Sequence, residues 1–156
     1  MKVLLILVGK TTDKRLSVCI EDYMGRIIHY HPFEVNVIPE LKSTKHLSAE
    51  QQKQMEGDAI LKSIQPSDTV VLLDERGKEY RSIEFAQWIE QKQQNTRRLV
   101  FIIGGPYGFS KAVYQRANSQ IALSRMTFSH QMVRLFFVEQ FYRACTIARG
   151  EPYHHE

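Results

Sequence analysis

A glycine-rich segment directly follows one of the most apolar runs of the chain. Residues 99–103 read Leu-Val-Phe-Ile-Ile, and residues 104–108 read Gly-Gly-Pro-Tyr-Gly. Glycines after a strand let a ligand approach the backbone and leave N–H groups free to bind it. The segment is not a phosphate-binding loop, which needs a following Gly-Lys-Ser/Thr, and its spacing differs from a dinucleotide fingerprint. Either a ligand-binding loop or a plain tight turn is therefore expected here.

A second segment of this kind follows about fifteen residues later. Residues 123–128 read Leu-Ser-Arg-Met-Thr-Phe, so a short strand gives way to a polar break and then to apolar side chains. Such a loop could wrap a small amphipathic ligand with its backbone amides. The alternative is a strand-to-helix connection that simply covers the core.

Proton transfer and anion binding are possible for polar residues on the last helix and in the tail. His130 and Arg134 are four residues apart and share a helix face, whereas Arg143 lies on roughly the opposite side. The tail adds Tyr153 and His154, which would suit a segment lying over a pocket. A histidine can accept a proton near neutral pH, but His130 could equally be a hydrogen-bonded core residue.

Alternating strands and helices are expected to hold these residues in place. We predict an α/β fold with a parallel or mostly parallel sheet and helices on both faces. Strands are predicted at 3–8, 33–39 (nearer an edge), 69–73, 99–103 and 121–123. Helices are predicted over 16–27, from 48 to about 64, after 82, after 110 and from about 130 to 149.

Helix caps and polar turns are predicted to separate these elements. Residues 41–47 are predicted to be a polar, lysine-rich loop, and residues 74–78 a charged glycine turn. The predicted helix caps are Thr12 or Asp13, Ser48 (in a capping box with Gln51), Ser82, Ser110 and Ser129.

The composition is that of a single domain, residues 1–156. There are 21 Lys and Arg against 17 Asp and Glu, a net charge of +4, which permits an RNA partner without requiring one. Cys19 and Cys145 have no metal-ligand spacing and are expected to be reduced core thiols. Residues 1–8 are interpreted as a buried strand rather than a signal peptide, and no stretch is long enough to span a membrane. A soluble, cytoplasmic protein without a metal is expected.

The last predicted helix is apolar around most of its circumference. A helix of this kind must be covered on both sides. In a domain of this size, a subunit interface is the natural second cover.

Several of these segments occur together, in the same order, in one family. The chain resembles the ribosomal large-subunit pseudouridine methyltransferase H family, minimal SPOUT-class (trefoil-knotted) methyltransferases, from its first residue to its last. The resemblance is carried by the opening strand ending Val8-Gly9-Lys10, Leu73-Asp74-x-x-Gly77-Lys78, Ile103-Gly104-Gly105-Pro106-x-Gly108, Leu123-Ser124-x-Met126-Thr127-Phe128-x-His130-Gln131-x-x-Arg134, Glu139-Gln140-x-Tyr142-Arg143-Ala144 and Pro152-Tyr153-His154.

The resemblance implies a homodimer with a C-terminal trefoil knot that uses S-adenosylmethionine. The implied reaction is N3-methylation of a pseudouridine in 23S rRNA, in the stem-loop at the subunit interface of assembled ribosomes. The implied cofactor contacts are Leu73, Gly104, Leu123, Ser124, Arg125, Met126, Thr127 and Phe128. The implied RNA-facing catalytic region contains His130, Arg134, Arg143, Tyr153 and His154, and the tail is expected to complete the partner subunit's pocket.

The residue types suit this chemistry. A sulfonium methyl group is already activated, so the enzyme has to align the donor with the base nitrogen and remove its proton. His130 or His154 could accept that proton, and arginines could hold phosphate or stabilise the deprotonated base. Substrate choice is expected to come from a dimer surface that reads ribosome shape through phosphate contacts.

Three positions depart from the family pattern. Tyr107 stands where an acidic or amide residue is expected, Ser129 replaces a proline, and His155 replaces a basic residue. Tyr107 could alter a contact near the methyl group or stack on a base, and Ser129 offers a helix cap. Other functions also stay open: a SPOUT methyltransferase for another RNA such as tRNA, a non-catalytic ribosome-binding factor, and an α/β nucleotide-binding module.

Overall fold

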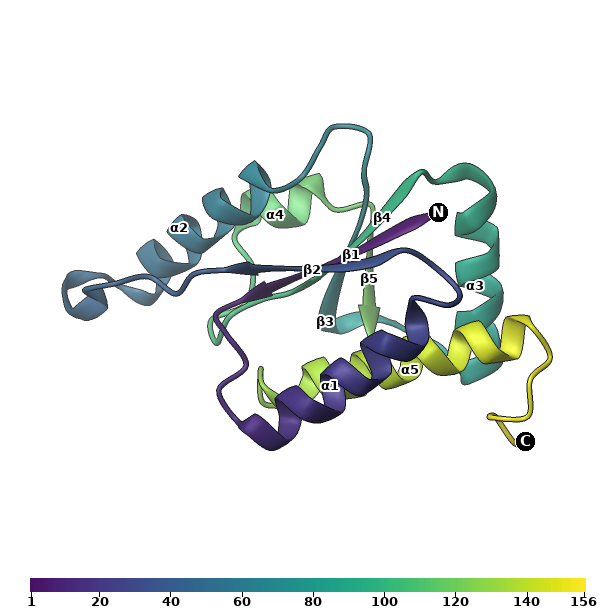
Figure 1. The fold of residues 1–156 in the computed structure, drawn as a ribbon. Coiled ribbons are helices and arrows are strands. Elements are labelled where there is room, and N and C mark those ends of the chain that lie inside the picture. The colour runs from purple at the N-terminus through teal and green to yellow at the C-terminus, as the bar shows by residue number, and fades with distance from the viewer.

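Five parallel strands form one sheet, in the order β2-β1-β4-β3-β5. The computed structural model describes residues 1–156 (Figure 1). The strands are β1 (Lys2–Val8), β2 (Phe33–Ile38), β3 (Thr69–Glu79), β4 (Arg98–Ile103) and β5 (Ser119–Ala122). The helices are α1 (Lys14–Ile27), α2 (Ala49–Lys62), α3 (Ser82–Asn95), α4 (Lys111–Arg116) and α5 (Met132–Ala148), with a 3-10 turn η1 (Thr44–His46).

Helices cover both faces of the sheet, as predicted. Figure 1 shows α2 and α4 on one side and α1, α3 and α5 on the other. Successive residues of β1 follow this division because strand side chains alternate between faces. Leu5 and Leu7 pack in the core beneath α1, α3 and α5, whereas Leu4 and Ile6 pack in the core beneath α2 and α4. The central strands are therefore apolar at nearly every position, which is what made them recognisable in the sequence.

Most predicted helix caps are confirmed. Asp13 accepts a hydrogen bond from the Arg15 amide, and Ser48 forms the expected capping box at the start of α2. Ser110 caps α4. The prediction at Ser82 is wrong by one residue: Ser82 is the first residue of α3, and the Glu84 carboxylate accepts from the Arg81 amide.

The predicted turn at residues 74–78 is in fact part of a longer strand. β3 continues to Glu79, and its pairing with β5 shifts register, so that both Leu73 and Lys78 are partners of Ile121. A Cβ on Gly77 would lie 2.6 Å from backbone atoms of Ile121, so only glycine allows this close approach. The intervening residues 74–76 bulge away from β5 and become available to the site.

The last helix lies between α1 and α3. Its inner side, including Phe137 and Phe141, is fully buried against the sheet, and Phe137 packs on Phe101 of β4 at 4.8 Å between ring centroids. Its outer side leaves Met132 and Phe136 about two-fifths exposed. The chain thus covers one side of α5 and leaves part of the other apolar side open.

Candidate active site

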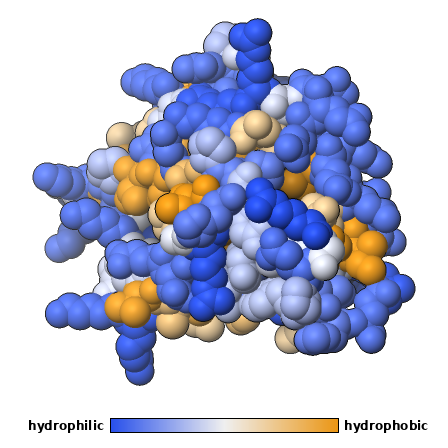
Figure 2. Space-filling view, turned by 45° about the vertical axis from the view of Figure 1, so that its right-hand side comes forward, coloured by the Kyte–Doolittle hydropathy of each residue, from blue (hydrophilic) through white to orange (hydrophobic).

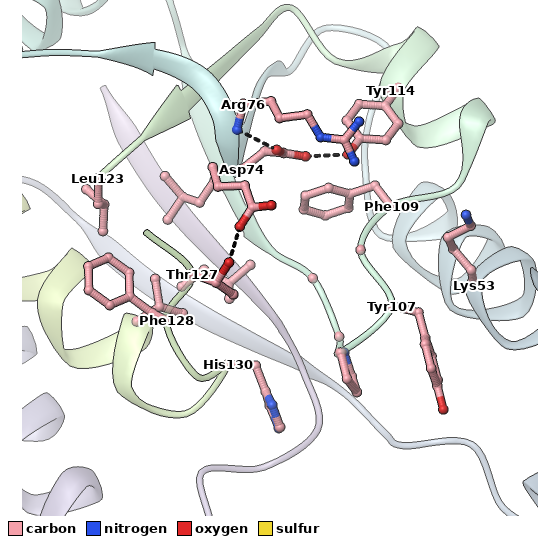
Figure 3. Close-up of a pocket in the computed structure, with 18 of the residues that line it drawn as sticks. Lys53, Asp74, Arg76, Tyr107, Phe109, Tyr114, Leu123, Thr127, Phe128 and His130 are labelled. Atoms are coloured by element: carbon pink, nitrogen blue, oxygen red, sulfur yellow. Dashed lines mark hydrogen bonds between the residues drawn. The ribbon is translucent and has the colours of Figure 1, made fainter. Parts of the chain in front are cut away.

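A cavity of about 990 Å³ opens at the carboxyl ends of β3, β4 and β5 (Figure 3). This is the edge of a parallel sheet at which ligands bind, and the volume suits a small molecule. Most of the residues that the family resemblance assigned to the cofactor line this cavity. They are Leu73, Gly104, Leu123, Ser124, Met126, Thr127 and Phe128.

The walls of the cavity are held by hydrogen bonds from the bulged part of β3. Tyr114 of α4 donates to the Asp74 carboxylate, and Thr127 donates to the Glu75 carboxylate (Figure 3). Burial, with help from Asp74, raises the pKa of Tyr114 to about 12, so this hydroxyl remains a donor at neutral pH. The bulge therefore connects the glycine loop side of the pocket with the 123–128 loop.

Sequence reasoning did not identify these wall residues as part of the site. The sequence predicts a charged glycine turn at residues 74–78 and a short helix after Ser110, which contains Tyr114. The strand order could have identified them. The residues after β3 lie at the same edge of the parallel sheet as the glycine loop, which follows the neighbouring strand β4.

Arg125 is the one residue of the 123–128 loop that does not line the cavity. Its side chain is exposed and pairs with Glu79, with 3.0 Å between Nε and Oε1. Ser124 instead stabilises the loop internally, because its hydroxyl accepts from the Met126 amide at 3.0 Å. The loop therefore contributes to the cavity through all its residues except Arg125.

His130 lines the cavity, and its ring makes no hydrogen bond within the chain. The side chain is half-buried and lies at the pocket in Figure 3. Ser129, next to it, accepts from the Met132 amide at 3.1 Å and so closes the turn that leads into α5, although the N-cap residue of α5 is Gln131 and not the predicted Ser129. An imidazole with both nitrogens free, held at a capped turn, is available to a ligand.

Arg134 has a different position from the RNA-facing one implied by the resemblance. The side chain is completely buried. Its guanidinium donates to the carbonyl oxygens of Val8, Gly9 and His130 at 2.8–3.0 Å, and to the Thr11 hydroxyl at 3.0 Å. Arg134 thus ties the end of β1 to the start of α5 and positions His130. This is a correction: the side chain does not reach the surface.

The other proposed catalytic residues gather at the far end of α5. Arg143 contacts the Glu139 carboxylate at 2.6 Å and the His154 ring at 3.3 Å (Nη1 to Nδ1). Tyr153 donates to the same Glu139 carboxylate at 2.9 Å, and its ring lies under the Arg143 guanidinium. We call Glu139, Arg143, Tyr153 and His154 the tail cluster.

The tail is anchored to α1 and the residues after it by further contacts. The Tyr23 and Tyr153 hydroxyls are 3.3 Å apart, and Tyr30 donates to the Glu151 carboxylate. That hydrogen bond raises the pKa of Tyr30 to about 12. Burial and the hydrogen bonds to Tyr23 and Glu139 also raise the pKa of Tyr153 well above its usual range. Tyr153 therefore stays protonated at neutral pH and acts as a hydrogen-bond donor.

The structure separates the five residues into two groups. Only His130 lies at the cavity, and none of the tail cluster lines it. From the first residue of α5 to Arg143 the helix advances about 16 Å, so one subunit does not bring the two groups together.

No cluster of three or more His, Cys, Asp or Glu residues could hold a metal ion. No helix is long and apolar enough to cross a bilayer. The two cysteines are unpaired, Cys19 being exposed rather than in the core and Cys145 buried.

Comparison with known proteins assigns the chain to a family. The family model described as "Predicted SPOUT methyltransferase" matches residues 1–154. Ribosomal RNA large subunit methyltransferase H of Bacteroides fragilis is 59% identical over 157 residues, covering 100% of both chains. The proteins of that name from Porphyromonas gingivalis and Christiangramia forsetii are 56% and 57% identical, covering 100% and 99% of both chains. The chain therefore belongs to the SPOUT methyltransferases, whose fold is knotted, and among them to the ribosomal RNA large subunit methyltransferase H family.

Proposed function

We propose that this protein methylates N3 of a pseudouridine in 23S rRNA, using S-adenosylmethionine and acting as a homodimer on assembled ribosomes in the cytoplasm. The carrying observation is the cavity at the carboxyl ends of β3, β4 and β5, built from the segments shared with the family. The names of the full-length relatives, with more than half of their residues identical, support the rRNA substrate.

The residues of the cavity fit the proposed methyl donor. Leu73, Ile103 and Leu123 offer an apolar surface for a flat ring, and the glycine loop offers backbone that a ligand can approach closely. Asp74 and Glu75 supply negative charge nearby, although each already accepts a hydrogen bond. When bound, S-adenosylmethionine supplies an activated methyl group on a cationic sulfur.

The chain then has to remove the N3 proton and stabilise the charge that remains on the base. We assign proton removal to His130, because its ring lies at the cavity and has no hydrogen-bond partner within the chain. His154 is less suited to this step because its ring is in contact with Arg143. An arginine N–H can only donate, so the contact with Arg143 makes Nδ1 the acceptor and leaves the proton of a neutral ring on Nε2.

We assign charge stabilisation to the tail cluster of the second subunit. Loss of the N3 proton places negative charge on the two neighbouring carbonyl oxygens of the base. Arg143 and the Nε2–H of His154 are donors suited to those oxygens. Glu139 fixes both Arg143 and Tyr153, so the donors are oriented before the substrate arrives.

The open side of α5 supports the proposed dimer. Met132 and Phe136 are about two-fifths exposed, and Phe136 packs beside Phe128 of the cavity loop, with 5.0 Å between ring centroids. A dimer contact here would be continuous with the cavity. By contrast, the face shown in Figure 2 is largely hydrophilic, with hydrophobic residues in small, separate patches.

Methyl transfer to ribosomes that lack the modification tests the proposal. Labelled S-adenosylmethionine is supplied, and the labelled nucleotide is mapped by mass spectrometry. We expect label on N3 of the pseudouridine, and a fall in kcat of about 100-fold in the His130→Asn variant, the low end for loss of a general base. Label on tRNA alone, supplied in a parallel reaction, would move the target to tRNA. Cofactor binding without transfer would identify a ribosome-binding factor, and the absence of cofactor binding would reject the methyltransferase assignment.

A further inference from the structure

Tyr107 is an exposed aromatic residue at the mouth of the cavity. Its side chain is 49% exposed and lines the cavity with the rest of the glycine loop. Other rings near the site pack on a second ring, as Phe128 does on Phe136 and Phe109 on Tyr114. Tyr107 takes part in none of the ring pairs, cation–π contacts or side-chain hydrogen bonds of the chain. The fold therefore gives this ring no packing role.

The backbone nevertheless holds Tyr107 firmly in place. The Gly108 amide donates to the Gly105 carbonyl at 3.2 Å, which closes a four-residue turn. Pro106 occupies the second position of this turn, where its fixed φ is favourable, and Gly108 ends it with a φ of 78°. Tyr107 therefore projects from the tip of a rigid turn, so little conformational entropy is lost when a partner binds the ring.

Positive charge lies on the same side of the cavity. Lys111 of α4 and Lys53 of α2 both line the cavity with Tyr107. Lys111 forms no ion pair, whereas Lys53 pairs with the exposed Glu50 carboxylate, with 2.9 Å between Nζ and Oε2, and would exchange that contact for a phosphate when RNA binds. Figure 3 shows Tyr107 and Lys53 across the pocket from Leu123 and Phe128. An exposed aromatic ring next to lysines is the combination with which proteins bind single-stranded nucleic acid: the ring stacks on a base and the cations contact phosphates.

We propose that Tyr107 is a stacking platform for an unpaired base of the RNA substrate next to the methylated nucleotide, with Lys53 and Lys111 contacting the adjoining backbone. The inference rests on the proposed function and deepens it, since it separates the RNA side of the cavity from the cofactor side. Leu73, Gly104 and Leu123 form the inner, cofactor side, and the rim that bears Tyr107 faces the RNA.

Direct binding of the cofactor-loaded protein to unmodified ribosomes tests this role, by co-sedimentation. Removal of the ring in Tyr107→Ala is expected to raise the ribosome Kd and the ribosome KM roughly tenfold, the usual scale for one stacked base. The cofactor Kd and kcat should stay within about twofold. Tyr107→Phe should restore wild-type affinity, because stacking needs only the ring. Met55→Ala is the control, since Met55 is an exposed apolar residue of α2 that does not line the cavity.

Two outcomes would overturn the inference. One is a ribosome Kd for Tyr107→Ala equal to that of the wild type. The other is a change in cofactor Kd or in the monomer–dimer equilibrium as large as the change in ribosome Kd, because the ring would then cover the cofactor or the partner subunit. Failure of the proposed function has a different signature, namely a wild-type protein that transfers no methyl group, and the binding comparison can be read in either case.

Discussion

Each end of α5 has a histidine and an arginine, but the two pairs differ in burial and in hydrogen bonding. At its start, His130 makes no hydrogen bond through its ring, whereas the nearby Arg134 is buried and donates to three backbone carbonyls and the Thr11 hydroxyl. At its end, Arg143 and His154 are half-buried and in contact with each other, and Arg143 also donates to the Glu139 carboxylate. The start of the helix thus borders an open cavity, and the end presents donors that are already oriented.

An arginine on the last helix does not by itself indicate a catalytic role. Arg134 and Arg143 are nine residues apart and point to opposite sides of α5. Desolvation lowers the pKa of Arg134, with a smaller opposing effect from Glu40, yet four hydrogen-bond acceptors surround its guanidinium. Its contribution is to the fold, whereas Arg143 can contribute to chemistry.

Substitution of each arginine by leucine tests this contrast most strongly. Arg134→Leu leaves the carbonyls of Val8 and Gly9 buried without donors, so the free energy of unfolding should fall by about 3–5 kcal/mol. Arg143→Leu should change it by less than about 1 kcal/mol, because that ion pair is partly solvated. Urea unfolding measures both. Equal losses of stability would show that the two ends of the helix do not differ in this way.

The cavity at the start of α5 can also be altered through its other wall, the bulge of β3. Gly77→Ala would place a Cβ against the Ile121 backbone, which forces β3 and β5 apart and moves the bulge that holds Asp74 and Glu75. We expect a loss of about 1–3 kcal/mol in stability and a weaker cofactor affinity, measured by urea unfolding and calorimetry.

Gly25→Ala in α1 is the matched control for that substitution, because nothing lies within 4 Å of the added Cβ. It should raise stability by about 0.5–1 kcal/mol and leave cofactor binding unchanged. If Gly77→Ala bound the cofactor with wild-type affinity, the bulge would not be part of the binding site.

A smaller effect is expected at Glu56, which lies behind the glycine loop. Its side chain is about nine-tenths buried, Oε2 has no hydrogen-bond partner, and a Cβ on Gly105 would lie 2.6 Å from that oxygen. Burial, with a smaller effect from Glu40, raises the pKa of this carboxyl. The folded state therefore holds the proton more tightly than the unfolded state, and stability falls as the pH rises from about 4.3 through the folded-state pKa.

Glu56→Gln should remove this pH dependence. At pH 8 the variant is expected to be more stable than the wild type by about 1 kcal/mol, and below pH 4 the two should be equal, as measured by urea unfolding across the pH range. A variant less stable than the wild type at pH 8 would show that the carboxylate makes a favourable contact.

Much of the fold could be predicted from local patterns. The apolar runs of β1 and β4 indicate strands buried on both faces, and Asp13, Ser48 and Ser110 mark helix starts because their side chains satisfy amides that the helix leaves unpaired. The glycine loop and the 123–128 loop are candidate ligand loops because glycine or polar residues directly follow an apolar strand in both. The properties of these segments depend mainly on residues close to them in the chain.

Only the tertiary structure decided the properties that depend on distant residues. Spacing placed His130 and Arg134 on one helix face. Arg134 is nevertheless buried by the end of β1, which lies more than a hundred residues earlier in the chain. The bulge at residues 74–76 exists because Gly77 meets β5, and the tail cluster forms because α1 lies beside α5. The sequence by itself determined most of the elements, the family and the candidate residues. Which of those residues are open to a ligand depends on what packs against them, and helical or strand periodicity contains no information about that.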